Sequence, residues 1–348
     1  MKITFIARYF PEDMKGGGVQ HIYELWKRAK KDHEVALISG WKKDPKLLPQ
    51  GTFPIRMSDN KFRNYLRFYL KTRKYLKRIK PDIIFSSCPE IPLLTKSVVL
   101  VPHFGHWLHL KQLSFTEKLQ RYFYINKMKK YTKVLTSSET SKKDLESVGI
   151  KVDNICYPGP SEEFKPGKKT SKKFVILCPS RISKEKGQHM LIRAIMELDP
   201  DILKNLEINI VGFVNDPQFL LYLQKASQGF PIKITTNANS MLEYYHNSDV
   251  VVFPTLMYEG FGMVAGEAAA CGIPVIASDF PAIREVLSDN ALYFAPGDTG
   301  QLAKHIATLY ENKKLRLELG KKSRNYVIKK FNWEDRYNEL NQIFQSLK

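Results

Sequence analysis

Residues 250–277 read VVVFPTLMYEGFGMVAGEAAACGIPVIA. An apolar run, 250–253, is typical of a buried strand and stops at a proline. A glycine-containing loop then leads into an alanine-rich helical segment. A second apolar run, 273–277, follows Gly272. The order strand, loop, helix, strand predicts a βαβ unit. Because ligands of open α/β sheets bind beyond the carboxyl ends of the strands, we expect the loop to border a ligand site.

Two carboxylates, Glu259 and Glu267, flank this loop and the start of the helix. Carboxylates accept hydrogen bonds from sugar hydroxyls, and a helix N-terminus offers free amides and partial positive charge to a diphosphate. Gly260 and Gly262 let the main chain approach a ligand closely. These residue types suit recognition of a sugar nucleotide. Alternatively, Glu259 is a solvated loop residue and Glu267 a helix N-terminal acid favoured by the macrodipole.

The segment resembles the Glu-x7-Glu motif of the retaining, family 4 type glycosyltransferases, and further matches follow in the family's order along nearly the whole chain. They are Gly17-Gly18-Val19, His103 after the strand 98–101, 136–139, Tyr157-Pro158-Gly159 with Phe164, the strand 175–178 with Ser180-Arg181 and Lys186-Gly187, 208–212, and Phe331-Asn332-Trp333. The resemblance implies an α/β fold of the GT-B type: two facing Rossmann-like domains and a C-terminal helix crossing back to the first domain. It also implies a retaining, metal-independent hexosyltransferase whose donor is a nucleotide-diphosphate sugar and which needs no cofactor.

The resemblance assigns roles to the matching residues. Arg181 and Lys186 match the basic pair that grips the donor diphosphate, where two cations would neutralise the leaving group. Glu267 matches the residue that holds the nucleotide ribose, Glu259 the one that holds hydroxyls of the transferred sugar, and His103 a histidine near the reacting centre. The implied catalytic set is His103, Arg181, Lys186 and Glu259; the implied donor-binding set is Gly17, Gly18, Arg181, Lys186, Glu259, Gly260, Phe261, Gly262, Met263, Val264 and Glu267.

Two parts of this assignment have structural alternatives. Arg181 and Lys186 could be surface charges in a βα loop. Glycines 16–18 match the loop that closes on the donor phosphates, but they could also form a flexible turn. They are no dinucleotide fingerprint, because the pattern Gly-x-Gly-x-x-Gly fails at His21.

Other positions leave the site open. His103 competes with His106 and His109 for the place near the reacting centre. Where relatives often show paired glycines before Pro-Glu, this chain reads Ser-Asp-Phe-Pro-Ala-Ile-Arg-Glu over 278–285, so the loop departs from the family. Asn237 stands near a common glycine and could supply the same left-handed backbone. The sequence therefore names no nucleotide base.

Turn-forming and polar residues predict a domain boundary between 157 and 173. We expect an N-terminal Rossmann-like acceptor-binding domain at 1–160 and a C-terminal Rossmann-like nucleotide-sugar donor-binding domain at 161–330. A helix over 331–348, with Asn332 as its N-cap, is expected to pack back on the first domain.

Composition is typical of a globular protein with room for two cores: 348 residues, 43% of them hydrophobic. The four cysteines lack metal-type spacing and are interpreted as reduced packing residues. No signal-peptide pattern or run of about 20 apolar residues occurs, so we expect a cytoplasmic protein. Asp199-Pro200-Asp201 is a literal Asp-x-Asp, but at an expected helix end it indicates capping rather than a metal site.

Positive charge is concentrated in the first part of the chain. Residues 1–150 contain 30 Lys and Arg against 13 Asp and Glu, a net +17, whereas residues 151–348 contribute +3 of the total +20. The segment 61–80 has no acid and predicts a helix whose apolar face comprises Phe62, Leu66, Tyr69, Leu76 and Ile79, with Phe68 and Tyr75 among the cations. A second basic helix is predicted over 115–133, with Tyr122, Phe123 and Tyr124 among its cations.

Basic helices with interleaved aromatic residues suit an anionic membrane surface or a polyanion. Alternatively, these are ordinary crossover helices whose lysines and arginines keep the surface soluble. In the resembled family the first domain takes the acceptor, and many members glycosylate lipid-linked acceptors. We therefore expect a lipid-linked or cell-envelope saccharide as acceptor, a peripheral location on the inner face of the cell membrane, and no nucleic-acid partner. The alternatives are a non-catalytic polyanion- or membrane-binding module and a GT-B nucleotide-sugar epimerase.

Overall fold

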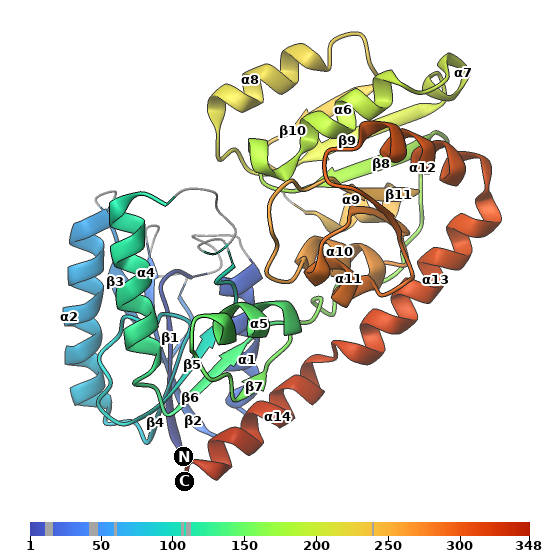
Figure 1. Ribbon diagram of the computed structural model, residues 1–348. Coiled ribbons are helices and arrows are strands. Elements are labelled where there is room, and N and C mark those ends of the chain that lie inside the picture. The colour runs from blue at the N-terminus through green and yellow to red at the C-terminus, as the bar shows by residue number, and fades with distance from the viewer. Residues whose placement is uncertain (11–16, 42–47, 59–60, 106–107, 109–112, 239) are drawn as a thin grey trace. The chain divides into compact units, whose positions relative to one another are not determined.

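The computed structural model describes residues 1–10, 17–41, 48–58, 61–105, 108, 113–238 and 240–348. The chain forms two compact units (Figure 1). Unit 1 comprises residues 1–158 and 331–348, and unit 2 comprises residues 159–330. Each is built on a parallel sheet with helices packed on it, which is the α/β architecture that the sequence predicts.

Unit 1 has a sheet of seven described strands in the order β3-β2-β1-β4-β5-β6-β7. The strands are β1 (Lys2–Ala7), β2 (Glu34–Trp41), β3 (Thr52–Arg56), β4 (Ile83–Ser86), β5 (Lys96–Val101), β6 (Lys133–Thr136) and β7 (Asn154–Ile155). Its described helices include α1 (Gly17–Ala29), α2 (Lys61–Ile79), α4 (Phe115–Met128), α5 (Glu139–Ser147) and α14 (Trp333–Ser346). The strand order changes direction at β1, which pairs with β2 on one side and β4 on the other.

The C-terminal helix α14 belongs to unit 1, as predicted. Its N-cap is Asn332, whose side chain accepts a hydrogen bond from the main-chain nitrogen of Glu334 at 2.8 Å. The buried Phe344 ring packs edge-on against Phe5 and Phe85, with ring centroids 6.2 and 5.7 Å apart. Burying an apolar helix face against strand side chains is what stabilises the return of the chain to this sheet.

The buried face of α2 differs in part from the predicted one. Leu76 and Ile79 are buried as predicted, and the other buried residues described in this helix are Asn64, Phe68 and Thr72. Phe68, expected among the cations, is in the core, whereas Leu66 is 52% exposed. The side chain of Phe62 lies outside the described residues. Asn64 has a partner on the buried side, because its Oδ1 accepts a hydrogen bond from the main-chain nitrogen of Ser58 at 2.7 Å. A polar residue with a local partner thus occupies the buried side, which a count of apolar residues cannot anticipate.

The second basic helix is shorter than predicted. Helix α4 ends at Met128, and Lys133 begins strand β6 instead of closing the helix. Lys133 pairs with Asp153 at 3.1 Å. Helix α4 begins with a complete capping box between Ser114 and Glu117, which satisfies main-chain donors at its start.

Unit 2 has a sheet of six described strands in the order β10-β9-β8-β11-β12-β13. The strands are β8 (Phe174–Pro179), β9 (Leu206–Val211), β10 (Ile232–Thr235), β11 (Val250–Phe253), β12 (Val275–Ser278) and β13 (Leu292–Phe294). Its described helices include η2 (Lys184–Lys186), α6 (Gln188–Met196), α7 (Pro200–Leu203), α8 (Pro217–Ala226), α9 (Leu242–Asn247), α10 (Met263–Ala270), α11 (Pro281–Leu287), α12 (Thr299–Glu311) and α13 (Lys313–Lys330). Residues 250–277 lie in the unit β11-α10-β12, and its two strands pair in parallel as predicted.

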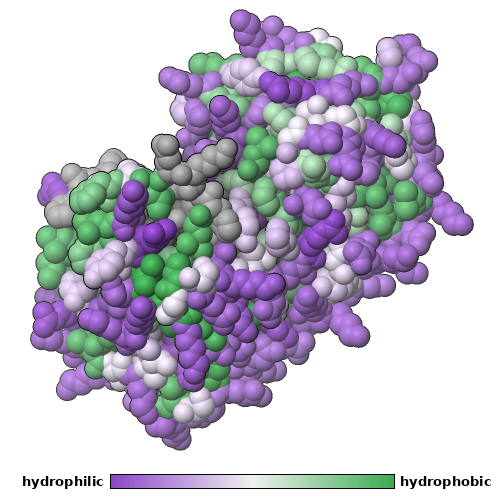
Figure 2. All heavy atoms as spheres, viewed as in Figure 1, coloured by the Kyte–Doolittle hydropathy of each residue, from purple (hydrophilic) through white to green (hydrophobic). Residues whose placement is uncertain are grey.

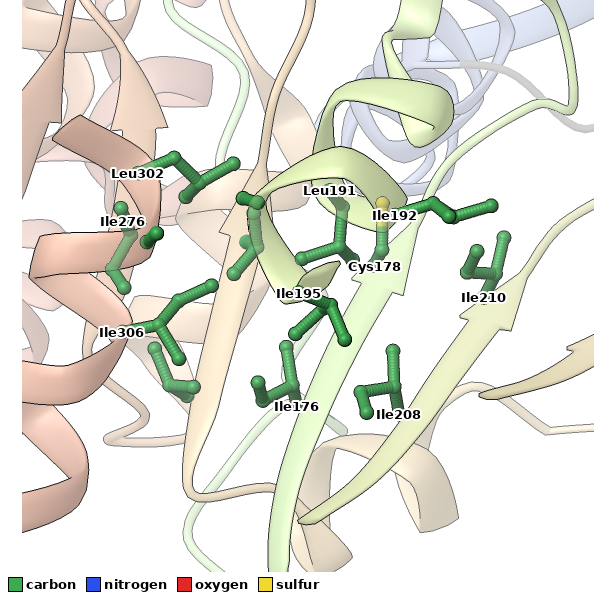
Figure 3. Close-up of a cluster of buried hydrophobic side chains, with 14 of the residues drawn as sticks. Ile176, Cys178, Leu191, Ile192, Ile195, Ile208, Ile210, Ile276, Leu302 and Ile306 are labelled. Carbon is green, nitrogen blue, oxygen red and sulfur yellow. The ribbon is translucent and has the colours of Figure 1, made fainter. Parts of the chain in front are cut away.

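The core of unit 2 lies between its sheet and helices α6 and α12 (Figure 3). Cys178 of β8 packs there beside Leu191 of α6, and burial raises the pKa of this thiol to about 12. All four cysteines are free and buried, which confirms the prediction that they are packing residues. Asp199 caps α7 by accepting a hydrogen bond from the main-chain nitrogen of Asp201 at 2.7 Å, so the capping interpretation of Asp-x-Asp is confirmed.

Candidate functional site

The carboxyl ends of β9, β8 and β11 bring several predicted site residues of unit 2 together. The strand order changes direction at β8, which pairs with β9 on one side and β11 on the other. Gly212, which follows β9, packs so closely on the loop after β8 that a Cβ atom there would lie 1.7 Å from the carbonyl oxygen of Ser180. Ligands of doubly wound sheets bind at such a switch point, outside the carboxyl ends of the strands.

Gly187 locks the loop after β8 to the loop after β11. Its φ angle is 71°, and a Cβ atom there would lie 1.8 Å from the carbonyl oxygen of Pro254. The main-chain nitrogen of Leu256 donates to the carbonyl oxygen of Glu185 at 2.8 Å. Only glycine fits this close approach of two backbones, and the contact places Lys186 against the β11–α10 loop.

Lys186 and Glu259 form an ion pair across these two loops. Their side chains are 11% and 14% exposed, so water screens the pair only weakly. The Thr255 hydroxyl also donates to Oε1 of Glu259 at 3.0 Å, and the Lys186 ammonium lies 5.7 Å from the centroid of the Phe253 ring. The sequence predicted both charged residues but not that they contact each other, and nothing in its pattern marked Thr255.

Arg181 is half-buried in the loop between β8 and η2. The fully buried Gln188 holds this loop, because its Nε2 donates to the Arg181 carbonyl oxygen at 2.6 Å and to Oγ of Ser180 at 2.8 Å. Among the described residues, no carboxylate pairs with the Arg181 guanidinium. Its charge is therefore available to an anion. Gln188 was missed from the sequence, since a glutamine after Lys-Gly carries no signal of its own.

The N-terminus of α10 has no side-chain cap. Gly262 is the N-cap with φ of 94°, and the residues before and after it are Phe261, which is buried, and Met263 and Val264, which are half-buried. First-turn amides of a helix have no intrahelical acceptor, and they carry the positive end of the helix dipole. The half-buried Gly260 and this helix start provide main-chain donors rather than charged side chains.

Glu267 faces α9 rather than a cation. The Tyr245 hydroxyl donates to Oε2 of Glu267 at 2.9 Å. Burial raises the pKa of Glu267 to about 7; the hydrogen bond from Tyr245 opposes this rise, and the negative charge of Glu163 adds to it. The Tyr245 ring is fully buried and packs edge-on against Phe164, with centroids 5.5 Å apart. Sequence reasoning missed Tyr245, because no motif marks it.

The predicted residues of unit 1 lie beyond the carboxyl ends of β1 and β5. Gly17 and Gly18 lie in the first turn of helix α1 instead of in the loop that we expected. The start of a helix also presents free main-chain amides, so it can offer a phosphate the same kind of donor as such a loop. A Cβ atom on Gly18 would lie 3.3 Å from Cγ of Pro102, the residue before the half-buried His103. Gly16, His106 and His109 lie outside the described residues.

Two further expectations concern loops of unit 2. Asn237 does not take the left-handed conformation, because the described non-glycine residues with positive φ are Lys80 and Ser288. The local chain therefore does not need the glycine-like geometry that we inferred.

In the segment 278–285, Arg284 donates to both carboxylate oxygens of Asp279, with Nη2 at 2.8 Å from Oδ2, and helix α11 begins at Pro281.

The described ranges contain neither a metal-type side-chain cluster nor a membrane-spanning helix. No group of three or more His, Cys, Asp or Glu side chains there is arranged to hold a metal ion. In the same ranges, every helix is too short or too polar to cross a bilayer.

Two family models match the chain. The model described as Glycosyltransferase Family 4 matches residues 15–159, and the model described as Glycosyl transferases group 1 matches residues 160–326. Together they cover residues 15–326. The chain therefore belongs to the group 1 glycosyltransferases.

Curated relatives are similar over part of their length. The capsular polysaccharide biosynthesis glycosyltransferase CapM of Staphylococcus aureus is 27% identical over 208 residues, which are 58% of this chain and 53% of that protein. The sulfoquinovosyl transferase SQD2 of Arabidopsis thaliana is 23% identical over 283 residues, 74% of this chain and 55% of that protein. This chain thus spans about half the length of the curated relatives it matches.

Solved structures show the fold over the whole chain. A sucrose-phosphate synthase from Thermosynechococcus elongatus has a TM-score of 0.83 at 19% identity, with 99% of this chain and 98% of that chain covered. WaaG, a glycosyltransferase of lipopolysaccharide biosynthesis, has a TM-score of 0.80 at 16% identity, with 98% and 99% covered. Anabaena HepE in complex with UDP and glucose has a TM-score of 0.80 at 19% identity, with 99% and 100% covered. The fold is GT-B, as expected.

Proposed function

We propose that this protein is a retaining glycosyltransferase that moves a hexose-type sugar from a nucleotide-diphosphate sugar to a saccharide acceptor, without a metal or cofactor. One observation carries the proposal: the Lys186–Glu259 pair and the Arg181 loop lie at the carboxyl ends of β8 and β11, where the strand order of unit 2 changes direction. Family membership and the UDP bound to the structural neighbour HepE support a nucleotide-sugar donor.

The chemistry follows from the charges at this edge of the sheet. As the anomeric carbon loses the diphosphate, negative charge grows on the leaving group and positive charge on the sugar. Lys186, Arg181 and the first-turn amides of α10 would stabilise the leaving group, while Glu259 accepts hydrogen bonds from sugar hydroxyls. If the acceptor hydroxyl attacks from the side of the departing phosphate, the configuration is retained and the protein needs no nucleophile.

Glu259 has a second effect in this scheme, because it holds Lys186 in place. The pair is mostly buried and Thr255 supports it, so the ammonium is already oriented before a diphosphate arrives. A preorganised cation costs little reorganisation when charge develops in the transition state. We therefore expect substitution of Glu259 to weaken both sugar recognition and leaving-group stabilisation.

The surface of unit 1 supports a membrane-associated acceptor. Helix α2 exposes Leu66 and Leu70, each by about half, beside a groove of about 440 Å³ lined by Arg63, Leu66, Arg67, Leu70, Lys71 and Lys74. Helix α4 exposes Phe115, Tyr122 and Phe123 by 79%, 63% and 59%. Figure 2 shows apolar surface next to hydrophilic surface on the visible face of unit 1.

Such a surface suits the headgroup region of an anionic bilayer. Exposed leucine and aromatic side chains can enter the acyl boundary, and each nearby cation contributes about 1 kcal/mol at an anionic leaflet. We propose that the protein binds peripherally to the inner face of the cell membrane and that its acceptor is a lipid-linked or cell-envelope saccharide. These additions rest on α2 and α4, not on the site of unit 2.

The donor proposal is tested by incubating the protein with a panel of nucleotide sugars and measuring the nucleoside diphosphate released, with and without a lipid extract. Release that depends on Lys186 supports the proposal. The exposed Lys184 lies in the same short helix η2, so Lys184→Ala is the matched control for Lys186→Ala. If no nucleotide sugar binds while anionic vesicles still bind, the protein is a membrane-binding module and the donor assignment is wrong.

A further inference from the structure

We propose that Tyr245 is a positioning residue for the donor nucleotide: its hydroxyl orients Glu267 and favours the ionised carboxylate that accepts hydrogen bonds from the ribose hydroxyls. This inference rests on the proposed function, because it assumes that Glu267 receives the ribose. It adds a residue that neither the resemblance nor the sequence pattern assigns, and it makes donor affinity depend on pH.

The geometry leaves one carboxylate oxygen for a ligand. The Tyr245 hydroxyl donates to Oε2 of Glu267 at 2.9 Å, and no donor among the described residues is hydrogen-bonded to Oε1. Glu267 is half-buried on α10, whereas Tyr245 is fully buried on α9. A buried phenol that donates to a partly exposed carboxylate fixes the rotamer of that carboxylate and still leaves its second oxygen accessible.

Helix α9 is held in place by the segment that begins unit 2. Phe164 packs edge-on against the Tyr245 ring, with an angle of 89° between the ring planes. The next contact is a hydrogen bond between Nε2 of His246 and the carbonyl oxygen of Lys165 at 2.9 Å. A Cβ atom on Gly167 would lie 2.3 Å from the His246 ring, so this glycine is packed flush against α9. The orientation of Tyr245 is therefore determined by packing, before any ligand binds.

The charges around Glu267 explain why a single hydroxyl matters. Burial disfavours the carboxylate, and Glu163 repels it. At the C-cap of α10, burial raises the pKa of Cys271 to about 12, so this thiol is neutral near pH 7. Arg324 of α13 donates to the carbonyl oxygen of Ala270, the residue before Cys271. Tyr245 is thus the described group that donates a hydrogen bond directly to the carboxylate.

Protonation of Glu267 changes what it can bind. An ionised carboxylate accepts hydrogen bonds at both oxygens, whereas a protonated acid turns one oxygen into a donor that cannot accept from a ribose hydroxyl in the same way. In Tyr245→Phe the ring and its packing on Phe164 remain, but the donor to Oε2 is lost. The pKa of Glu267 then rises further, so less carboxylate is ionised at pH 7 and nearly as much as before at pH 8.5.

The experiment measures dissociation constants of UDP, GDP and ADP, each separately, for the full chain at pH 6, 7 and 8.5. For the nucleotide that wild-type protein binds, we expect Tyr245→Phe to raise the dissociation constant about fivefold at pH 7 and less than about twofold at pH 8.5. The matched control is Tyr244→Phe. Tyr244 is the neighbouring tyrosine on α9, and its hydroxyl contacts Oγ1 of Thr235 at 3.4 Å. Removing this hydroxyl should change the affinity for the nucleotide less than about twofold at every pH.

Each outcome bears on the proposal. A loss of affinity that is equal at all three pH values shows a merely structural role and overturns it, as does unchanged affinity. Should Tyr245→Phe fail to fold, Glu267→Gln serves instead: its affinity should be low and lack the wild-type pH dependence around pH 7, and retention of that dependence would overturn the inference. If wild-type protein binds none of the three nucleotides, the proposed function fails, and this inference fails with it.

Discussion

Glu259 and Glu267 lie eight positions apart in one motif, yet their surroundings are opposite. Glu259 lies against the ammonium of Lys186, with a hydroxyl from Thr255 in support. Glu267 has a hydroxyl partner, Tyr245, and its pKa is raised to about 7 by burial. Two carboxylates in one motif can therefore have different electrostatic environments. A cation balances the charge of Glu259, whereas burial brings the pKa of Glu267 close to neutral pH.

The largest effect should come from breaking the Lys186–Glu259 ion pair by substituting Lys186. Lys186→Ala removes a preorganised cation and leaves a mostly buried carboxylate without its partner, so we expect nucleoside diphosphate release to fall by a factor on the order of 100 to 1000. Lys184→Ala should leave the rate within about twofold, because Lys184 is exposed. Equal rates for the two variants would remove Lys186 from the donor site.

The next effect tests the backbone contact that puts Lys186 beside Glu259. Gly187→Ala introduces a Cβ atom against the carbonyl of Pro254 at a residue with positive φ, so we expect a loss of about 3 kcal/mol in the free energy of unfolding. Gly229→Ala is the control. Gly229 also has positive φ, but nothing lies within 4 Å of its added Cβ, so about 1 kcal/mol is expected. Urea denaturation measures both, and similar losses would contradict a tight contact at Gly187.

A third test separates the effect of Glu267 on the free energy of unfolding from its role in donor binding. The folded pKa of about 7 lies above the ordinary 4.5, so the folded state binds the proton more tightly than the unfolded state. Its contribution to stability is fully present below pH 4.5 and is lost as the pH rises through about 7. Glu267→Gln cannot ionise. Between pH 4.5 and 8 we expect its stability to rise relative to wild type by about 3 kcal/mol, while donor binding falls. Parallel stability curves would show that the pKa of Glu267 is not raised.

The smallest effect is expected on α2, away from both carboxylates. Leu70→Ser and Lys71→Gln on α2 should each weaken binding to anionic vesicles by about 1 kcal/mol, because each removes one apolar or charged contact with the leaflet. Neither should change donor hydrolysis. Sedimentation with anionic and neutral vesicles measures binding, and Lys225→Gln on α8 of unit 2 is the charge-matched control. Equal losses for Lys71→Gln and Lys225→Gln would remove α2 from the membrane proposal.

Much of the fold could be predicted from the sequence because its signals are local. The apolar runs at 250–253 and 273–277, separated by a helix, predicted β11-α10-β12, and the structure confirms their parallel pairing. Asn332 and Asp199 were predicted as caps, and each accepts a hydrogen bond from a main-chain nitrogen close by in the chain. Such contacts span two or three residues, so the residue type at one position is enough to indicate them.

Predictions failed where a contact outside the apolar pattern decides the outcome. The face of α2 was misplaced in part, because the polar Asn64 bonds Ser58 on the buried side and Phe68 lies in the core. Tyr245 escaped notice because its partner, Glu267, is 22 residues away. The roles of the donor residues stay predictions, because the family resemblance carries them.

The β11-α10-β12 unit, the caps at Asn332 and Asp199 and the family of each half could be read from the sequence alone, because periodicity, turn residues and motifs are local patterns of the chain. Tertiary structure decided which charges meet. It set Lys186 against Glu259 through the contact of Gly187 with Pro254, and it left Glu267 with a phenol instead of a cation. The physical reason is that burial and pairing energies depend on distances between side chains, and residue spacing along the chain does not fix those distances.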